Sequence, residues 1–263
     1  MRVLAIDLGG TKIAAGLVDQ KGIIRDRIEE PVDKSDPVAQ IAHLAEGKTF
    51  DAIGVAVPGL VRRDGTVWAP NIPNWESIPL AKLLRRELGV SVFVESDRNA
   101  AVLGEAWRGA ARGKKDVVAL IVGTGIGAGI LNGGKLVRGA HELSGCAGWM
   151  VVTDETNENT MRAGSLEALA AGPALARHKD FGHTGRLLGI AVANLISLFD
   201  PEVVVLTGGV MNSADKFLDI LIQNARRRAQ PLSASQVAIV VSTLQSDANL
   251  LGVAKLATME TRL

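Results

Sequence analysis

The chain has 263 residues, of which 47% are hydrophobic and 22% charged, and its formal net charge at pH 7 is +1. This length and composition are typical of a well-packed globular protein with room for two lobes, each with its own core. The near-neutral charge provides no basic field for nucleic acid or for an acidic membrane surface, so neither partner is expected.

Cysteine usage and the first residues bear on the compartment. Cys146 is the only cysteine, which excludes an internal disulfide and a cysteine-based zinc cluster. Residues 1–20 do not have the pattern of a signal peptide, and no apolar run reaches the ~18 residues that a membrane span needs. We therefore expect a cytoplasmic protein.

The first predicted element is a β-hairpin over residues 3–19, in which two apolar strands flank the turn Gly9-Gly10-Thr11-Lys12. Adjacent glycines let backbone N–H groups close on an anion, so this turn is a candidate phosphate site. Asp7 precedes the turn, and its carboxylate would repel a phosphate unless a cation lay between them. We therefore interpret Asp7 as a partner of hydrated Mg²⁺. A tight hairpin with a surface aspartate is the alternative.

Strands and helices alternate through the rest of the first half. The patterns predict strands over residues 23–30, 52–57 and 90–94 and helices over 36–46, 79–88 and 99–108. The strand at 52–57 stops at Pro58-Gly59, which places the next loop where open α/β sheets bind ligands. Residues 68–75 contain two tryptophans and two asparagines, which suit a polar, ring-shaped ligand. Ser96 and Asp97 precede the last of these helices. For both residues, a purely structural role as the N-cap of that helix is the alternative to a functional one.

The second half repeats this design. Residues 118–135 form a second predicted hairpin with the turn Gly123-Thr124-Gly125. Two copies predict two similar lobes, whose glycine turns could hold a polyphosphate from both sides. We place the boundary in the glycine-rich connection at 109–113, which gives lobes of residues 1–112 and 113–263.

The later elements follow the same alternation, which indicates an α/β fold. We expect a loop over 138–149, a polar, turn-like stretch over 154–164, strands over 150–152, 203–206 and 237–241, and helices over 165–171, 185–199, 215–228 and 249–259. Gly208-Gly209 follows the strand at 203–206. It either lets an adenine ring or ribose lie against backbone or is a plain turn.

As a set, these motifs resemble the ROK family (repressors, open reading frames and sugar kinases) of the actin-like ATPase superfamily. The matching residues are Asp7 to Lys12, Val57-Pro58-Gly59, Asn71, Asp97 with Asn99-Ala100-Ala101, Leu103-Gly104-Glu105, residues 123–127 and Leu206 to Val210. The order holds from residue 2 to about residue 255. The resemblance implies a two-lobed, ribonuclease H-like fold with an interlobe cleft, and ATP-dependent phosphorylation of a hexose or N-acylhexosamine with Mg²⁺.

The resemblance also implies roles for single residues. The family's aspartate at the position of Asp97 is the general base, which accepts the proton of a sugar hydroxyl, usually the 6-hydroxyl, as that oxygen attacks the γ-phosphoryl group. The residues expected at the sugar are Gly59, Asn71, Ser96, Asp97, Glu142, Cys146 and Trp149. Those expected at the nucleotide are Gly9, Gly10, Thr11, Lys12, Gly123, Thr124, Gly125, Gly208 and Gly209.

The sequence departs from the family pattern around the sugar. Family kinases usually carry Asn-Asp where this chain has Ser96-Asp97, and Glu-x-Gly-His where it has Cys146-Ala147-Gly148-Trp149. Losing both the Glu and the His could weaken transition-state binding roughly 10²-fold or more. Trp149 could offer a stacking face instead, with Glu142 or His141 reaching in, and core packing is the alternative for Trp149. The family's zinc motif is absent, so no zinc site is expected.

Two functions other than that of an ATP-dependent sugar kinase are alternatives. A non-catalytic or weakly catalytic sugar-binding regulator is the main alternative, without a DNA-binding domain because the kinase-like body starts at Met1. A kinase for another acceptor, or one with polyphosphate as donor, ranks last because the sequence offers no extended basic groove. Between His178 and Arg186 the chain is shorter than family members usually are. In the family this region often lies near the dimer contact. A homodimer is therefore one of the assemblies left open.

Overall fold

The computed structural model describes residues 1–154 and 156–261, which form two compact units. The first unit contains residues 1–108 and 138–143 and the C-terminal segment that begins at residue 246. The second contains residues 109–137 and 144–245. In the described residues, no helix combines the length and apolarity that crossing a bilayer requires.

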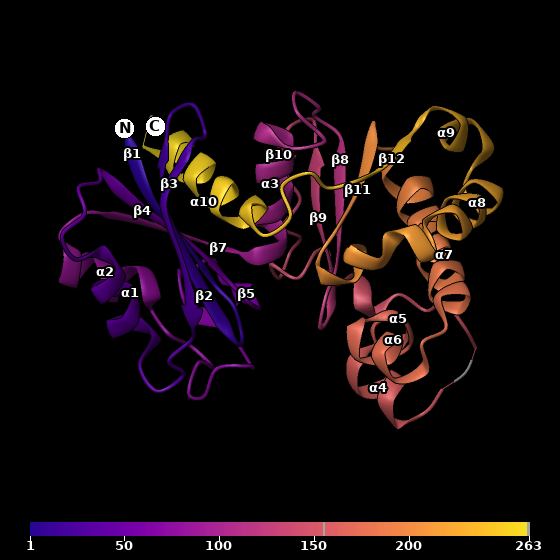
Figure 1. Cartoon of the computed structure of the whole chain (residues 1–263), viewed down its shortest axis with the longest axis horizontal. Helices are drawn as coiled ribbons and strands as arrows, with labels where there is room; N and C mark the ends of the chain where they lie inside the picture. Colours follow the sequence, from indigo (N-terminus) through magenta and orange to yellow (C-terminus); the bar gives the residue numbers. More distant parts are fainter. Residues whose placement is uncertain (155, 262–263) are drawn as a thin grey trace. The chain divides into compact units, whose positions relative to one another are not determined.

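The first unit is built on a five-stranded sheet in the order β3-β2-β1-β4-β7 (Figure 1). Its strands are β1 (Arg2–Leu8), β2 (Lys12–Asp19), β3 (Ile24–Pro31), β4 (Ala52–Val57) and β7 (Ser91–Ser96), with β5 (Leu60–Val61) and β6 (Val67–Trp68) pairing separately. Its helices are α1 (Pro37–Ala45), α2 (Leu80–Leu88), α3 (Asp97–Arg108) and α10 (Asp247–Glu260). β1 and β2 pair antiparallel in register from Arg2 and Asp19 to Leu8 and Ile13, which confirms the predicted hairpin.

Successive side chains of this sheet point to opposite faces, and different helices cover the two faces. Ile53 and Val55 of β4 pack in one hydrophobic cluster with Ile41 of α1 and Leu84 of α2. Gly54 lies between them on the other face, where a Cβ atom would stand 2.6 Å from the backbone oxygen of Val253 in α10. The sheet is therefore covered by α1 and α2 on one face and by α10 on the other (Figure 1).

Helix α10 belongs to the first unit, whereas the order of elements along the chain predicts residues 249–259 in the second lobe. A Cβ atom at Gly252 would stand 1.8 Å from the backbone oxygen of Ala100 in α3, and one at Gly104 would stand 2.0 Å from that of Ala248. Glycine alone permits such close helix contact. The expected boundary at residues 112 and 113 thus misses the return of residues 138–143 and of α10, because contacts between distant segments leave no local pattern.

The second unit repeats the topology of the first, with the sheet order β10-β9-β8-β11-β12. In both sheets three neighbouring strands pair antiparallel and two more follow in parallel, which confirms the predicted duplication. The strands are β8 (Val117–Val122), β9 (Ile126–Asn132), β10 (Lys135–Leu136), β11 (Val203–Thr207) and β12 (Ala238–Val241). The helices are η1 (Ala147–Trp149), α4 (Glu158–Ala163), α5 (Ser165–Ala170), α6 (Gly172–His178), α7 (Phe181–Phe199), η2 (Gly209–Lys216), α8 (Leu218–Arg228) and α9 (Pro231–Gln236).

Three local predictions in this unit are wrong. Residues 150–152 form no strand, because they follow η1 and Val151 is 75% exposed rather than packed beside a neighbouring strand. The stretch expected to be turn-like at 154–164, of which residue 155 lies outside the described residues, contains α4, started by a capping box at Asn157. The helix expected at 215–228 is divided at Phe217, whose backbone is not helical. Helices α6 and α9 were not predicted.

Candidate active site

The glycine turn between β1 and β2 closes on itself and leaves two amides available. The N–H of Gly9 donates to the backbone oxygen of Lys12 at 2.8 Å. Across the described part of the chain, the N–H groups of Gly10 and Thr11 make no hydrogen bond. A Cβ atom at Gly10 would stand 3.7 Å from Cβ of the exposed Asn71, so two predicted ligand residues lie side by side. The Lys12 ammonium is paired with Glu29 at 2.7 Å.

Asp7 lies on the sheet face that α10 covers, where its carboxylate accepts a hydrogen bond from Nδ2 of Asn249 at 3.1 Å. Burial raises the pKa of Asp7 to about 7, the Asn249 hydrogen bond opposes this, and the Asp97 carboxylate adds to the rise. Asp7 also lines a hollow of about 260 Å³. The other residues around this hollow are Gly9, Thr11, Lys12, Ala14, Glu29 and Ser246.

The residues around Asp7 fit a hydrated divalent cation of the Mg²⁺ type. Asp7, Glu29, Thr11 and Ser246 line one hollow, and their side chains carry oxygen, the ligand atom that Mg²⁺ prefers. The Glu29 carboxylate is paired with Lys12 and Arg27, so Asp7 is the carboxylate there without a cationic partner among the described residues. Within the described residues, no lysine or arginine forms an ion pair with Asp7. A cation there would offset the charge that burial and Asp97 disfavour.

Asp97 begins α3 directly after β7, at the same carboxyl edge of the sheet as the end of β4. Its carboxylate accepts the N–H of Arg98 at 2.7 Å. Burial raises the pKa of Asp97, and the Arg98 hydrogen bond and the Arg98 charge oppose that rise. A half-buried carboxylate with raised proton affinity is suited to accept a proton.

Two residues close to Asp97 in the chain carry buried polar atoms without partners in the part of the chain that the structure describes. Among the described residues, the buried Oγ of Ser96 and Oδ1 of Asn99 have no hydrogen-bond partner. Arg98 donates to the backbone oxygen of Gly59 at 3.0 Å. Gly59 itself has φ +119°, and a Cβ atom there would stand 2.2 Å from the backbone oxygen of Trp68, so only glycine fits.

Two predicted ligand side chains of this unit are engaged elsewhere. Trp75 is buried in the hydrophobic core of the first unit, so only Trp68 of the two loop tryptophans is exposed. The Glu142 carboxylate pairs with Nε of Arg63 at 2.9 Å, and its backbone oxygen accepts Nη2 of Arg98 at 3.1 Å. Glu142 is therefore fixed at this place by two arginines.

The second unit gathers its glycines around the end of β8. The Gly123 N–H donates to the backbone oxygen of Gly125 at 2.9 Å, and the Gly172 N–H donates to that of Gly123 at 2.8 Å. A Cβ atom at Gly208 would stand 2.5 Å from the backbone oxygen of Val122, whereas one at Gly209 would meet nothing within 4 Å. Like Gly10 and Thr11, Thr124 and Gly125 have N–H groups that no other described residue binds.

Cys146 precedes the short helix η1 in this unit, and Trp149 is the last residue of that helix. Cys146 is half-buried, and Trp149 is 58% exposed, which rules out core packing for the tryptophan. The nearby Glu167 accepts the Ile126 N–H at 2.7 Å, with its carboxylate against Gly125 and Gly148. The Glu167 carboxylate thus lies beside the second glycine turn and beside Gly148, the residue before Trp149.

The family model described as the ROK family matches residues 3–181 and 179–260. The chain belongs to the ROK family. It is 30% identical to a glucokinase of Thermotoga maritima, with 97% of each chain covered. It is 34% identical to the bifunctional enzyme NanE/NanK of Brucella melitensis, over 97% of this chain and 54% of that protein.

Solved ROK structures resemble this chain over its whole length. A ROK hexokinase from Thermus thermophilus matches with a TM-score of 0.87 and 33% identity, covering 100% of this chain and 99% of the other. A ROK glucokinase from Streptomyces griseus, solved with glucose and AMPPNP, matches with a TM-score of 0.84 and 27% identity, covering 98% and 100%. These matches confirm the α/β, actin-like fold.

The ROK motifs did not lead to several residues that contact the predicted ones. Asn249 contacts Asp7 from α10, Glu95 contacts Ser96 and Asn99, and Glu167 contacts the second glycine turn. Glu95 is adjacent to Ser96 in the chain, so a charged residue at the end of an apolar strand is a usable signal. Asn249 and Glu167 come from distant helices and carry no such signal.

Proposed function

We propose that this protein is an ATP-dependent sugar kinase that transfers the γ-phosphoryl group to a hydroxyl of a hexose or N-acylhexosamine, with the 6-hydroxyl as the acceptor. Asp97 carries the proposal, because it is a half-buried carboxylate with a raised pKa at the ligand edge of the sheet. The relatives of the protein include glucokinases and an enzyme named NanE/NanK.

In the proposed reaction the Asp97 carboxylate takes the proton of the acceptor hydroxyl. An electron pair on the deprotonated acceptor oxygen attacks the γ-phosphorus in line. The bond from that phosphorus to the oxygen that bridges to the β-phosphate breaks, and its electrons stay on that bridging oxygen. The products are the sugar phosphate and ADP. Proton transfer to a positioned base contributes typically ~10²–10⁴-fold to such a rate.

The glycine turns supply donors without side chains. The available N–H groups of Gly10 and Thr11 in the first unit, and of Thr124 and Gly125 in the second, are the proposed phosphate ligands. Gly208 and Gly209 are the proposed nucleoside contacts. Asp7 would hold Mg²⁺ through water, and the bound ion would neutralise phosphate charge.

The sugar contacts are proposed for Gly59, Asn71 and Ser96 in the first unit and for Cys146 and Trp149 in the second. Ser96 has a buried hydroxyl without a partner, and Trp149 offers an exposed indole. The Glu142 carboxylate is already paired with Arg63, so we do not propose it as a direct ligand of the sugar; its role is to hold residues 138–143 in place. The proposed acceptor therefore presents one apolar face to an aromatic ring, as sugar rings and N-acetyl groups do.

The test is an ATP-coupled assay over a panel of hexoses and aminosugars with the natural chain, Asp97→Asn and Asp26→Asn. Asp26 is exposed, stands on the edge strand β3 and has φ +49°, which asparagine tolerates, so it is a control for loss of one carboxylate. We expect Asp97→Asn to lower kcat by roughly 10²–10⁴-fold, and Asp26→Asn to leave it unchanged.

Two results would contradict the proposal. Full activity of Asp97→Asn would show that another group is the base. Sugar binding in calorimetry, with no sugar-dependent ATP consumption for any member of the panel, would instead favour the sugar-binding regulator, which the full-length similarity to kinases does not favour.

A further inference from the structure

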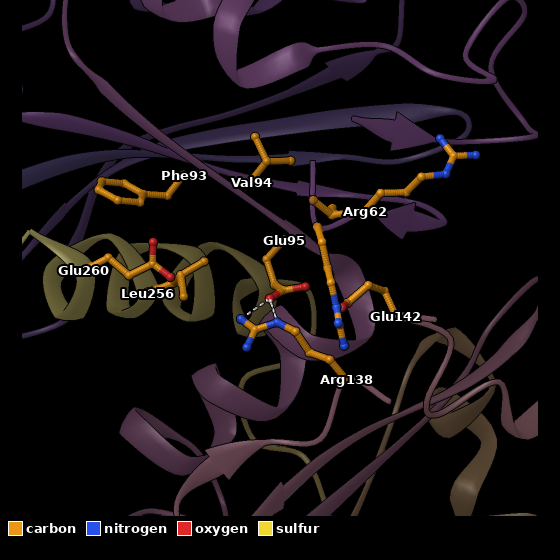
Figure 2. A pocket seen from close by; sticks show the side chains of 10 residues that line it. Arg62, Phe93, Val94, Glu95, Arg138, Glu142, Leu256 and Glu260 are labelled. Carbon is orange, nitrogen blue, oxygen red and sulfur yellow. Dashed lines mark hydrogen bonds and ion pairs between the residues drawn. The ribbon is translucent and has the colours of Figure 1, made fainter. Parts of the chain in front are cut away.

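The Glu95 carboxylate, two residues before Asp97, binds three different groups. Its Oε1 accepts the Ser96 N–H at 2.8 Å and Nδ2 of Asn99 at 3.0 Å. Its Oε2 accepts Nε and Nη2 of Arg138 at 3.1 and 2.7 Å (Figure 2). Glu95 is only 5% exposed. A buried carboxylate needs a charged partner, because a charge left unpaired in the protein interior is strongly destabilising.

Arg138 reaches Glu95 from a segment that leaves and re-enters the second unit. Residues 138–143 belong to the first unit, while the residues on both sides of them belong to the second. Two anchors hold this segment in place besides the Arg138 contact, namely the Arg98 bond to the Glu142 backbone and the Arg63 bond to the Glu142 carboxylate. Arg138 and Glu142 line one hollow together with Glu95 (Figure 2).

The Asp97 side chain depends on the backbone for its position. Its carboxylate is bound by the N–H of the adjacent Arg98, within the same turn. Glu95 holds both ends of this turn, residues 96–99, through the Ser96 N–H and the Asn99 side-chain amide. A shift of Glu95 would therefore move the backbone that carries Asp97.

We propose that Glu95 and Arg138 are positioning residues for the base: Arg138 holds the Glu95 carboxylate in place, and Glu95 fixes the turn that presents Asp97. The catalytic consequence rests on the proposed function, whereas the ordering of the turn does not. Displacing a reacting group by about 1 Å can cost ~10²-fold in rate.

The test compares Arg138→Met, Arg138→Lys, Glu95→Gln and the control Lys114→Met. Lys114 pairs with Glu202 at 3.0 Å in the second unit, so the control removes a cation from another ion pair. We expect Arg138→Met and Glu95→Gln to lower kcat by about 10- to 100-fold, with the KM for ATP unchanged. Arg138→Lys should recover part of kcat, and Lys114→Met should keep all of it.

A second change separates pairing from general damage. In the Glu95→Gln background, Arg138→Met should lower kcat much less than it does alone, because no charge remains to be paired. Equal losses in the two backgrounds would overturn the proposal, as would a loss of kcat that Arg138→Lys does not reduce.

Amide hydrogen exchange of the peptide that covers residues 95–100 tests the positioning without any activity measurement. We expect Arg138→Met to speed exchange there and Lys114→Met to leave it unchanged. Faster exchange in a chain that turns over no sugar would uphold the ordering role while the kinase proposal fails. Unchanged exchange would overturn the positioning role, whether or not the natural chain is an active kinase.

Discussion

Replacing Gly252 with alanine should push apart helices α3 and α10, which pack against each other and carry Asp97 and Asn249. A Cβ atom there would stand 1.8 Å from the backbone oxygen of Ala100, against the 3.4 Å at which ordinary contact begins. Helices α3 and α10 must therefore move apart by about 1.6 Å, and the obstructing atom is backbone that no rotamer change can remove. Overpacking of this kind costs about 1–3 kcal/mol, and we take the upper end.

The better helix propensity of alanine offsets about 1 kcal/mol of that cost. A net loss of about 2 kcal/mol should lower the melting temperature by roughly 4–8 °C for a unit of this size. Calorimetric or fluorescence melting measures the change directly. We also expect kcat to fall, because α3 begins with Asp97 and α10 carries Asn249.

Gly182→Ala is the matched control in helix α7. A Cβ atom at Gly182 would meet its nearest neighbours at 3.4 and 3.5 Å, so alanine fits there. This control should raise the melting temperature slightly, since only a propensity gain applies, and that gain is smaller than the ~1 kcal/mol of a helix interior because Gly182 is the second residue of α7. If Gly252→Ala raised the melting temperature as the control does, the close packing of α3 on α10 would be refuted.

Three further predictions concern single polar groups. Burial raises the pKa of Asp7 from 3.8 to about 7, so the free energy of unfolding of the metal-free protein should fall as pH rises from about 4 to about 7. Asp7→Asn should abolish this fall, and equal slopes of melting temperature against pH for the natural chain and the variant would contradict the prediction. The N–H of Lys115 and the Lys114 ammonium lower the pKa of Glu202 to about 2, so its stabilisation is present above pH 4.5 and is lost toward pH 2; Glu202→Gln should melt lower at pH 7 and match the natural chain near pH 2, and an equal deficit at both pH values would count against this. Ser96→Ala removes a buried hydroxyl without a partner and should not lower the melting temperature, whereas the KM for the sugar should rise; a clear loss of stability would show that the hydroxyl is bonded in the free protein.

Local patterns were sufficient for most strands and for the duplication. The glycine turns at residues 9–12 and 123–125 stand between apolar runs, and a hairpin is the structure that such a pattern favours. The predicted bounds of α1 and α2 fall within one residue of those observed at either end, because Asp36 caps the first and Gly89 ends the second. The motif set likewise pointed to the family without any coordinates.

Local patterns failed at two further places, for two different reasons. The polar stretch before Gly164 forms α4 because the Asn157 capping box stabilises its start, although few apolar residues mark it as a helix. Trp75 is a core residue rather than a ligand face, since packing and not residue type decides which side chains are buried.

The sequence by itself determined the two hairpins, the alternation of strands and helices and the identity of the carboxylates at positions 7 and 97, since these depend on neighbours within a few residues. Only the tertiary structure decided that α10 packs on the first sheet, that Asn249 binds Asp7 and that Arg138 pairs with Glu95. Those contacts depend on glycines that let backbones approach and on charges brought together by chain folding, and neither effect has a period that a sequence pattern records.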